Sequence, residues 1–309
     1  MFLDKLAISR ALYERFRELA PVKLSSRNVI VRDVLKLLQE KPSCVAIKAD
    51  FREFYESISR KKVLSHLLEK KCIDNELYDQ AHHILSEENL PGSNGGVPRG
   101  LVVSSLLCEH FMEEFDESVR NIKGVFYYAR YVDDIVILTD HNCVDLRKKL
   151  SKICPEGLEF NKRKSFFSNC MCTVSTQFTD CLQCQDCRTQ IQNVLQPPVP
   201  PRQFDLLGYN IRREMNGAID VAIAPSKIAK IKNRIVTAFV RFMKNRNEGE
   251  LVAAMEYLSS NHRLYLDAMP RYNGLAIVYR EAINSPRCHK QMDELTFFFA
   301  ESLELRKDD

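Results

Sequence analysis

The sequence predicts an α+β fold in which an antiparallel sheet is combined with helices, and three observations support this. First, Tyr127–Leu138 (YYARYVDDIVIL) holds two runs of β-forming residues on either side of a tight turn, which is typical of a β-hairpin. Second, Cys44–Phe51 (CVAIKADF) is a short apolar run that predicts a buried strand. Third, apolar residues recur with helical spacing near both ends of the chain, for example in Asp4–Ala20 and Pro225–Asn247.

The bulk properties are those of an ordinary soluble globular protein. The chain has 309 residues, of which 45% are hydrophobic and 28% charged, enough for one large domain and a smaller one. Neither a membrane-spanning segment nor a signal peptide fits the sequence, so we expect a cytoplasmic protein without a membrane partner. The net charge of +4 says little about partners, and the distribution of the charges says more.

Three aspartates are the candidates for a metal site. Asp133 and Asp134 lie at the turn of the expected hairpin, and Asp50 lies near the end of the buried strand. Adjacent carboxylates repel each other, and they are tolerated where a divalent cation sits between them and another acid. The alternatives are a solvated Asp-Asp turn and an Asp50 that only caps the following turn.

A glycine-rich loop and an aromatic residue accompany the acids. Asn94–Leu107 (NGGVPRGLVVSSLL) runs into a helix that we expect to end near Arg120. Glycine permits close backbone approach, proline fixes a turn, and a helix N-terminus attracts phosphate; a plain loop-to-helix junction is the alternative. Tyr55 either walls a sugar-binding pocket or fills the core. The basic turn 162–164 is a candidate contact for a triphosphate.

Cysteines are concentrated after residue 165. Four thiolates can share a tetrahedral Zn²⁺, but these spacings differ from the usual paired CxxC motifs. Two interpretations therefore stay open: a structural zinc site, or a Cys-rich insertion of reduced thiols at about residues 170–203. The cluster begins at Cys170, and the candidate zinc ligands are Cys172, Cys181, Cys184 and Cys187.

The helix expected from Pro225 to about Asn247 is amphipathic. Its polar face carries basic residues, and no acid occurs between residues 226 and 247. A solvated face usually mixes signs, so this pattern favours contact with a phosphate backbone. The basic positions are Lys227, Lys230, Arg234, Arg241 and Lys244.

The elements around this helix are also predicted from apolar patterns. Phe204–Ile211 is expected to form one strand around Gly208, with Ala218–Ala224 paired to it. After the basic helix, we expect three further helices and therefore an all-helical lobe. Their expected ranges are Glu250–Ser260, Leu264–Asn284 (broken near Pro270) and Gln291–Leu305.

Together, residues 44–225 resemble the reverse transcriptases. DFREFYESI is similar to the first palm motif of that family, which implies that Asp50 and the Phe51 backbone bind metal and that Tyr55 excludes a ribose 2′-hydroxyl. YVDD resembles the signature motif, which implies that Asp133 and Asp134 bind the catalytic metals.

Three more segments carry the resemblance. GVPRG resembles the loop that holds the templating base and the incoming nucleotide, NKRKS the basic motif near the leaving pyrophosphate, and LLGYNI the primer-grip hairpin. The helix from Pro225 stands where the thumb of the family begins. The residues implied are Pro98, Arg99, Gly100 and Lys164 for nucleotide and template, and Leu207 and Gly208 for the primer.

The resemblance implies a right-hand polymerase palm with reduced fingers at residues 1–224 and an all-helical thumb at 225–309. It implies DNA synthesis from dNTPs on an RNA template with two Mg²⁺ ions, for which Mn²⁺ can substitute. The compact core with a helical tail looks most like the bacterial defence-associated and abortive-infection reverse transcriptases. This implies an anti-phage role, with a dedicated non-coding RNA and a partner protein or second copy of the chain as partners.

Two departures from the family pattern keep other functions open. Arg99 stands where many relatives have glutamine, and the fingers segment before Cys44 is short. A second hypothesis is therefore protein-primed or template-independent DNA synthesis by the same active site. A third is a non-catalytic RNA-binding scaffold, which the intact acids disfavour because a scaffold needs no three uncompensated carboxylates.

Overall fold

A computed structural model describes residues 2–22, 24–40, 44–86, 95–140, 143–161, 167–170, 202–214, 216–259, 263–266, 269–272, 281–282 and 284–304. These residues form two compact units, one within residues 2–30 and 44–170 and one within 31–40 and 202–304. Neither unit contains, in its described part, a helix long and apolar enough to cross a membrane. The expected palm–thumb boundary at residue 224 stays a prediction.

The first unit is built around an antiparallel sheet whose central strand is β1 (Val45–Arg52). On one side of β1 lies β3 (Asp134–Thr139), and β2 (Val125–Tyr131) pairs with the outer edge of β3. On the other side, β5 (Phe167–Cys170) and β4 (Glu159–Phe160) pair with successive parts of β1. Both β1 and β3 are buried along most of their length, which explains their continuous apolar sequences.

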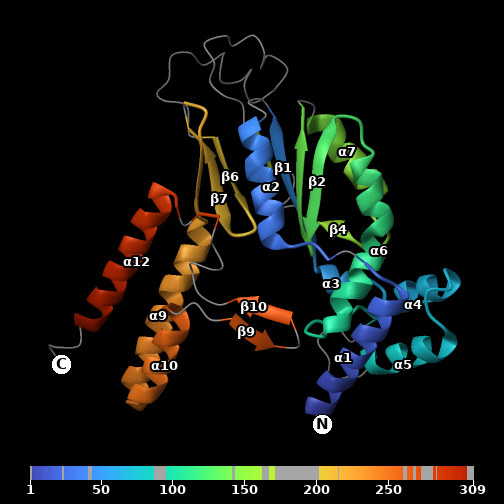
Figure 1. Cartoon of the computed structure of the whole chain (residues 1–309), viewed down its shortest axis with the longest axis horizontal. Helices are drawn as coiled ribbons and strands as arrows, with labels where there is room; N and C mark the ends of the chain where they lie inside the picture. Colours follow the sequence, from blue (N-terminus) through green and yellow to red (C-terminus); the bar gives the residue numbers. More distant parts are fainter. Residues whose placement is uncertain are drawn as a thin grey trace. The chain divides into compact units, whose positions relative to one another are not determined.

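Helices pack around this sheet (Figure 1). The helix α6 (Val102–Arg120) packs against β2 and also contacts α1 and α4. Its buried face includes Leu106, Leu107 and Phe115. The other helices are α1 (Phe2–Leu19), α3 (Phe54–Ser57), α4 (Arg60–Glu69), α5 (Asn75–Leu85) and α7 (Cys143–Ile153); α2 (Arg27–Glu40) begins in the first unit and continues in the second.

Two helix starts follow from local capping chemistry. The Ser59 side chain accepts a hydrogen bond from the Lys62 N–H at the start of α4, and Asp74 does the same for the Leu77 N–H at the start of α5. Such side-chain acceptors satisfy backbone donors that have no partner within the helix. Ser59 and Asp74 thus fix where α4 and α5 begin.

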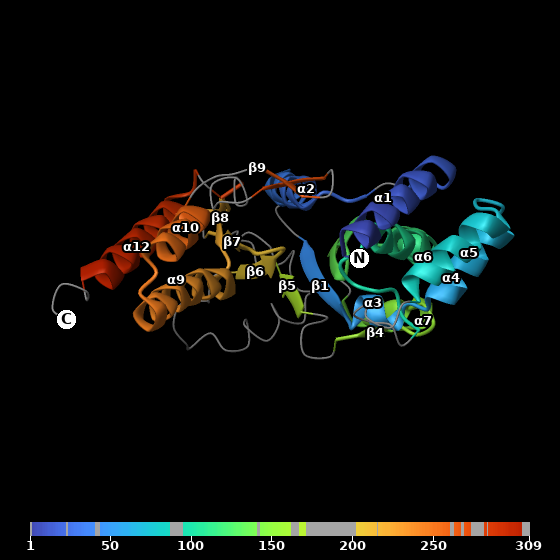
Figure 2. The same ribbon diagram turned by 90° about the horizontal axis from the view of Figure 1, so that it is seen from below.

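In its described part, the second unit holds a small sheet and three helices that follow the sheet in the chain, in addition to most of α2. The sheet has the order β6 (Arg202–Leu206), β7 (Tyr209–Arg213) and β8 (Ile219–Ile223), all antiparallel. Figures 1 and 2 show the helices lying side by side, and α9 contacts both of the others. Their core contains Ile235, Phe239, Phe242 and Leu251. The helices are α9 (Pro225–Asn245), α10 (Glu248–Ser259) and α12 (Pro286–Glu304).

The expectation of one strand over Phe204–Ile211 is wrong. Leu207 and Gly208 have φ angles of 49° and 85°, so the chain reverses there and forms the hairpin of β6 and β7. Two consecutive left-handed residues match the twist of paired strands in a two-residue turn. Leucine seldom adopts that conformation, so the apolar pattern by itself predicted one continuous strand.

The expected helix over Leu264–Asn284 is wrong in its first part, up to Tyr272, and the C-terminal lobe is therefore not all-helical. In its place β9 (Arg263–Leu266) and β10 (Met269–Tyr272) form an antiparallel pair. Pro270 lies in β10; proline is disfavoured inside a helix and tolerated at a sheet edge, and both strands of a two-stranded sheet are edges. The α+β class with an antiparallel sheet is confirmed.

Candidate active site

The three aspartates come from two neighbouring strands of the first unit. Strands β1 and β3 pair so that Asp50 lies opposite Asp134, and Asp133 lies in the turn directly before β3. The Phe51 N–H donates to the Asp133 carbonyl at 3.2 Å, which fastens this turn to the end of β1. The sheet thus places the three acids at one of its ends.

Each side of the acid pair has a polar neighbour. The Asn161 side chain donates from Nδ2 to Asp50 Oδ1 at 3.2 Å, and the Asn161 N–H donates to the Asp50 carbonyl at 2.7 Å. Lys48 Nζ lies 3.6 Å from Asp134 Oδ1. Asp50 is buried, whereas Asp133 and Asp134 are partly exposed. Neither Asn161 nor Lys48 was predicted as a site residue, although Asn161 is the first residue of the NKRKS motif and Lys48 precedes Asp50 by two positions.

The donor set has the chemistry of a hard divalent cation site, since Mg²⁺ and Mn²⁺ prefer carboxylate and carbonyl oxygens. In the part of the chain that the structure describes, however, no group of three His, Cys, Asp or Glu side chains is arranged to hold a metal ion. Mg²⁺ in phosphoryl-transfer sites is commonly bound by one or two carboxylates together with substrate phosphates. Asp50 and Asp134 fit that description, and the metal role of the Phe51 backbone stays a prediction.

Tyr55 is held close to these acids by the glycine-rich loop. The Val97 N–H lies 2.9 Å from the Tyr55 carbonyl and 3.0 Å from the Ile58 carbonyl, donating to both. Gly96 lies so close to α3 that a Cβ would come 2.4 Å from the Glu56 carbonyl oxygen. Burial is the main cause that raises the pKa of the Tyr55 hydroxyl, and the charge of Asp133 adds to it. The hydroxyl is therefore neutral at physiological pH.

Arg99 is engaged within the protein. Its Nε and Nη2 donate to the two carboxylate oxygens of Glu56 at 2.5 and 2.8 Å, and its guanidinium lies 6.0 Å from the centre of the Tyr55 ring. The hydrogen bond lowers the pKa of Glu56 and raises the pKa of Arg99. Pro98 beside it is buried, and Gly100, with φ 89°, leads into α6.

A buried charged cluster beneath the Asp133 turn was missed. Arg130 of β2 is only 3% exposed and pairs with Glu109 and Asp116 of α6, at 2.6 and 2.8 Å. The Tyr128 hydroxyl also donates to Asp116, at 2.5 Å. Two signals were available: an arginine within an apolar strand, and two acids seven residues apart in a largely apolar helix.

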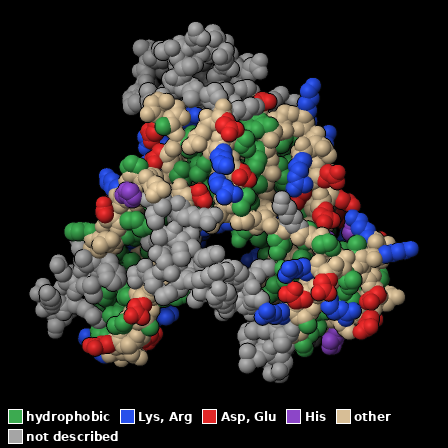
Figure 3. Space-filling view, viewed as in Figure 1, with side chains coloured by type: hydrophobic (Ala, Val, Ile, Leu, Met, Phe, Trp, Pro, Cys, Tyr) green, Lys and Arg blue, Asp and Glu red, His purple; other side chains and the backbone are tan. Residues whose placement is uncertain are grey.

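In the second unit, five basic positions of α9 are separated by three, four, seven and three residues and therefore share one stripe of the helix. Lys227, Lys230, Arg234, Arg241 and Lys244 belong to it. The face that Figure 3 shows carries basic and acidic side chains interspersed, whereas this stripe has a single sign. It offers phosphate groups a row of cations without an acid among them.

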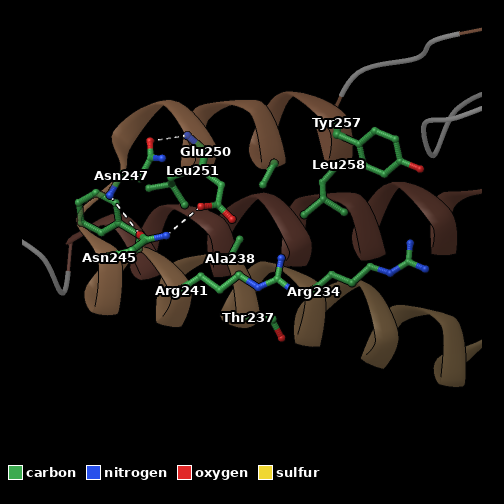
Figure 4. A pocket seen from close by; sticks show the side chains of 12 residues that line it. Arg234, Thr237, Ala238, Arg241, Asn245, Asn247, Glu250, Leu251, Tyr257 and Leu258 are labelled. Atoms are coloured by element: carbon green, nitrogen blue, oxygen red, sulfur yellow. Dashed lines mark hydrogen bonds between the residues drawn. The ribbon is translucent and has the colours of Figure 1, made fainter.

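Two residues of that stripe line a groove between α9 and α10. The groove has a volume of about 380 Å³, and Figure 4 shows Arg234 and Arg241 along its α9 side. Its one acid, Glu250, accepts a hydrogen bond from Asn245 at 2.8 Å. Within the described residues, neither guanidinium forms an ion pair, so both are available to an anionic partner.

The remaining candidate residues are placed only in part. Leu207 and Gly208 form the turn between β6 and β7. Lys164 and the candidate zinc ligands lie outside the described residues, and their roles stay predictions. Those ligands are Cys172, Cys181, Cys184 and Cys187.

Comparisons with known proteins point to one family. The family model described as "Reverse transcriptase (RNA-dependent DNA polymerase)" matches residues 5–211. Among solved structures, apo telomerase from Candida tropicalis, truncated from its C-terminal domain, is 15% identical with a TM-score of 0.44, over 71% of this chain and 45% of that chain. Telomerase from Candida albicans with a TWJ fragment of telomeric RNA is 10% identical with a TM-score of 0.42, over 96% of this chain and 47% of that chain.

The chain therefore spans just under half the length of each of these two solved chains. A comparison with curated proteins gives no match.

Proposed function

Because the chain belongs to the reverse transcriptase family, we propose that it is an RNA-directed DNA polymerase that extends a DNA 3′ end with deoxynucleotides. One observation carries this proposal beyond the family match. The register of β1 against β3 puts Asp50 beside Asp134, with Asp133 in the adjoining turn. Carboxylates on neighbouring strands, next to a half-buried aromatic ring and a docked glycine loop, suit nucleotidyl transfer.

Nucleotidyl transfer needs little covalent chemistry from a protein, so positioning and charge neutralisation supply most of the rate. When bound, two divalent cations activate the primer hydroxyl and neutralise the triphosphate. The chain's own part is to orient: Asn161 holds the Asp50 carboxylate, and the Phe51 N–H holds the Asp133 turn. Tyr55 presents a neutral ring that favours a sugar without a 2′-hydroxyl.

The test is primer extension by the purified chain on a DNA-primed RNA template with dNTPs and Mg²⁺. Asp50→Ala and Asp133→Ala should each lower DNA synthesis by at least about 1000-fold, because each removes a carboxylate from the reacting centre. Asp79→Ala, on the exposed side of α5, is the matched control and should retain activity. DNA synthesis that survives both site substitutions would exclude this active site.

A second candidate is template-independent or protein-primed synthesis by the same acids. It is favoured by the ion pair of Arg99 with Glu56, because many relatives have glutamine at the position of Arg99. An omission series decides: product made without template, or DNA linked covalently to the chain, supports this function, and strict template dependence excludes it.

The biological role in this proposal is defence of a bacterial host against phage, guided by a dedicated non-coding RNA. Its support is the resemblance of the compact catalytic core; the strands β9 and β10 remove the argument from an all-helical tail. Cells that express the chain should be compared with cells that express Asp133→Ala, by plating efficiency of a phage panel. Equal plating on both would refute a role that depends on synthesis.

A further inference from the structure

Arg130 uses every one of its five N–H groups. Nε and Nη2 donate to the two carboxylate oxygens of Asp116 at 2.9 and 2.8 Å. Nη1 and Nη2 donate to the two oxygens of Glu109 at 3.0 and 2.6 Å, and Nη1 also donates to the Val132 carbonyl at 3.1 Å. A guanidinium has five such donors, so the side chain is saturated.

The acceptors on α6 make this arrangement rigid. Glu109 and Asp116 are seven residues apart and therefore lie two helical turns apart on one face. Burial lowers the pKa of Arg130, but the hydrogen bonds and charges of Asp116 and Glu109 outweigh burial and raise the pKa overall. The guanidinium is always charged, and it cannot rotate without breaking several charge-assisted hydrogen bonds.

The fifth bond reaches a strained residue. Val132 has φ 60°, the left-handed conformation that β-branched residues rarely adopt. Such a conformation persists where surrounding contacts hold it, and the bond from Arg130 to the Val132 carbonyl is a contact of that kind. This carbonyl belongs to the planar peptide that joins Val132 to Asp133. Holding its oxygen therefore sets the direction in which the chain enters Asp133.

We propose that Arg130 is a positioning residue for the polymerase reaction, which couples the Asp133 turn to α6 through the Val132 carbonyl. The inference rests on the proposed function. The peptide before Asp133 is held by Arg130, and the peptide after it is held by the Phe51 N–H at 3.2 Å. Because its donors are all engaged, Arg130 acts on the aspartate's orientation and does not itself bind nucleotide or nucleic acid.

The first test is Arg130→Lys, which keeps the charge but cannot span both carboxylates and the carbonyl. We expect kcat for DNA synthesis to fall about 100-fold, as for a reacting group displaced by about 1 Å, with KM for dNTP changed less than roughly threefold. Hydrogen exchange of the turn 131–134 should rise by about tenfold or more, while α5 is unchanged.

A rescue experiment separates positioning from simple stabilisation. Glycine adopts a positive φ without steric cost. Adding Val132→Gly to Arg130→Lys should therefore raise kcat at least about fivefold above the kcat of Arg130→Lys alone. Val132→Ala keeps a Cβ and is the matched control, which should recover less. A role limited to folding predicts a lower Tm without a change in kcat below Tm, and without rescue. That result, or wild-type kcat in Arg130→Lys, overturns the proposal.

Two provisions keep the test decisive. If Arg130→Lys does not fold, the same measurements apply to Glu109→Gln, which leaves the Asp116 bonds in place and should lower kcat by about tenfold. The exchange measurement does not depend on DNA synthesis. If the wild type makes no DNA but the turn 131–134 loosens in the variants, the proposed function is wrong and the hold of Arg130 on the turn is confirmed. If the wild type makes DNA and the variants change neither hydrogen exchange in the turn nor kcat, only the proposed role of Arg130 is wrong.

Discussion

At the scale of single residues, Asp50 differs from the other two acids because it is buried and receives a side-chain hydrogen bond from Asn161. A donor to one carboxylate oxygen fixes the direction in which the carboxylate points. Hydrogen-bond partners behind metal ligands contribute to metal affinity as strongly as many ligands do.

Asn161→Ala should therefore weaken the apparent affinity for Mg²⁺ in DNA synthesis by about 10- to 100-fold. The backbone bond from Asn161 to the Asp50 carbonyl is unaffected, so we expect thermal stability to change little. Mg²⁺ titration of primer extension measures the effect, and Asn121→Ala at the exposed end of α6 is the control. An unchanged titration curve would remove Asn161 from the site.

The ion pair of Glu56 with Arg99 makes a pH-dependent prediction. The hydrogen bond from Arg99 holds the pKa of Glu56 in the folded protein below its ordinary value. The stabilisation of the folded state by this ion pair is therefore present at neutral pH and is lost as pH falls through that pKa. The pair is partly exposed, and its contribution should stay below about 1 kcal/mol. Hence Glu56→Gln should lower Tm slightly at pH 7, and the difference should shrink as pH falls through the lowered pKa of Glu56. A difference that grows on acidification contradicts the assignment.

Long-range contacts are the part of the site that sequence reasoning could not supply. Asn161 reaches Asp50 across 111 positions, and Arg130 reaches Asp116 and Glu109 across 14 and 21. The aspartates themselves were found because they sit in contiguous motifs between apolar runs. A partner that is distant in the chain leaves no local pattern; only its residue type, such as an arginine in a strand, marks it.

At the scale of elements, the docking of the glycine-rich loop on α3 depends on a missing side chain. Gly96→Ala would bring a Cβ against the Glu56 backbone, which cannot give way as a side-chain tip can. We expect a loss of about 1–3 kcal/mol of unfolding free energy and a higher KM for dNTP. Gly249→Ala in α10, where the nearest atom is 3.5 Å away, should be neutral or slightly stabilising. Urea titration compares the two variants.

The basic stripe of α9 predicts salt-dependent binding. Arg234→Glu should weaken the affinity for a primed RNA template, and the slope of log K against log salt should become shallower by about 0.7–0.9 per lost phosphate contact. Lys148→Glu on the exposed face of α7 makes the same charge change elsewhere and is the control. If both variants shift the slope equally, net charge and not this stripe is responsible.

Local signals explain which elements were predicted and which were not. The helix α9, predicted from Pro225, starts at that proline, and this signal is visible in a single residue. The strands β9 and β10 form through pairing with each other, which their apolar spacing does not reveal. The turn at Leu207 depends on a backbone conformation that leucine seldom adopts, so the apolar pattern did not indicate it, whereas the resemblance of LLGYNI to a hairpin did.

At the scale of the whole molecule, two compact units with separate cores should unfold separately. Ile235 in the second unit and Ile47 in the first are both 4% exposed, which makes them a matched pair. Changing either isoleucine to alanine should lower the free energy of unfolding of its own unit by about 2–5 kcal/mol. Calorimetry should show two transitions, with Ile235→Ala lowering one and Ile47→Ala the other. One transition lowered equally by both would mean that the units unfold as one.

The pairing of Asp50 with Asp134 has a consequence for how the protein can be prepared. Side chains alternate between the two faces of a strand, so a slip of one residue between β1 and β3 would turn Asp50 to the opposite face. A molecule with that slip would keep its mass and its helices but would have lost its active site. Specific activity after refolding from denaturant therefore counts the fraction of molecules in which these two strands found their correct partners.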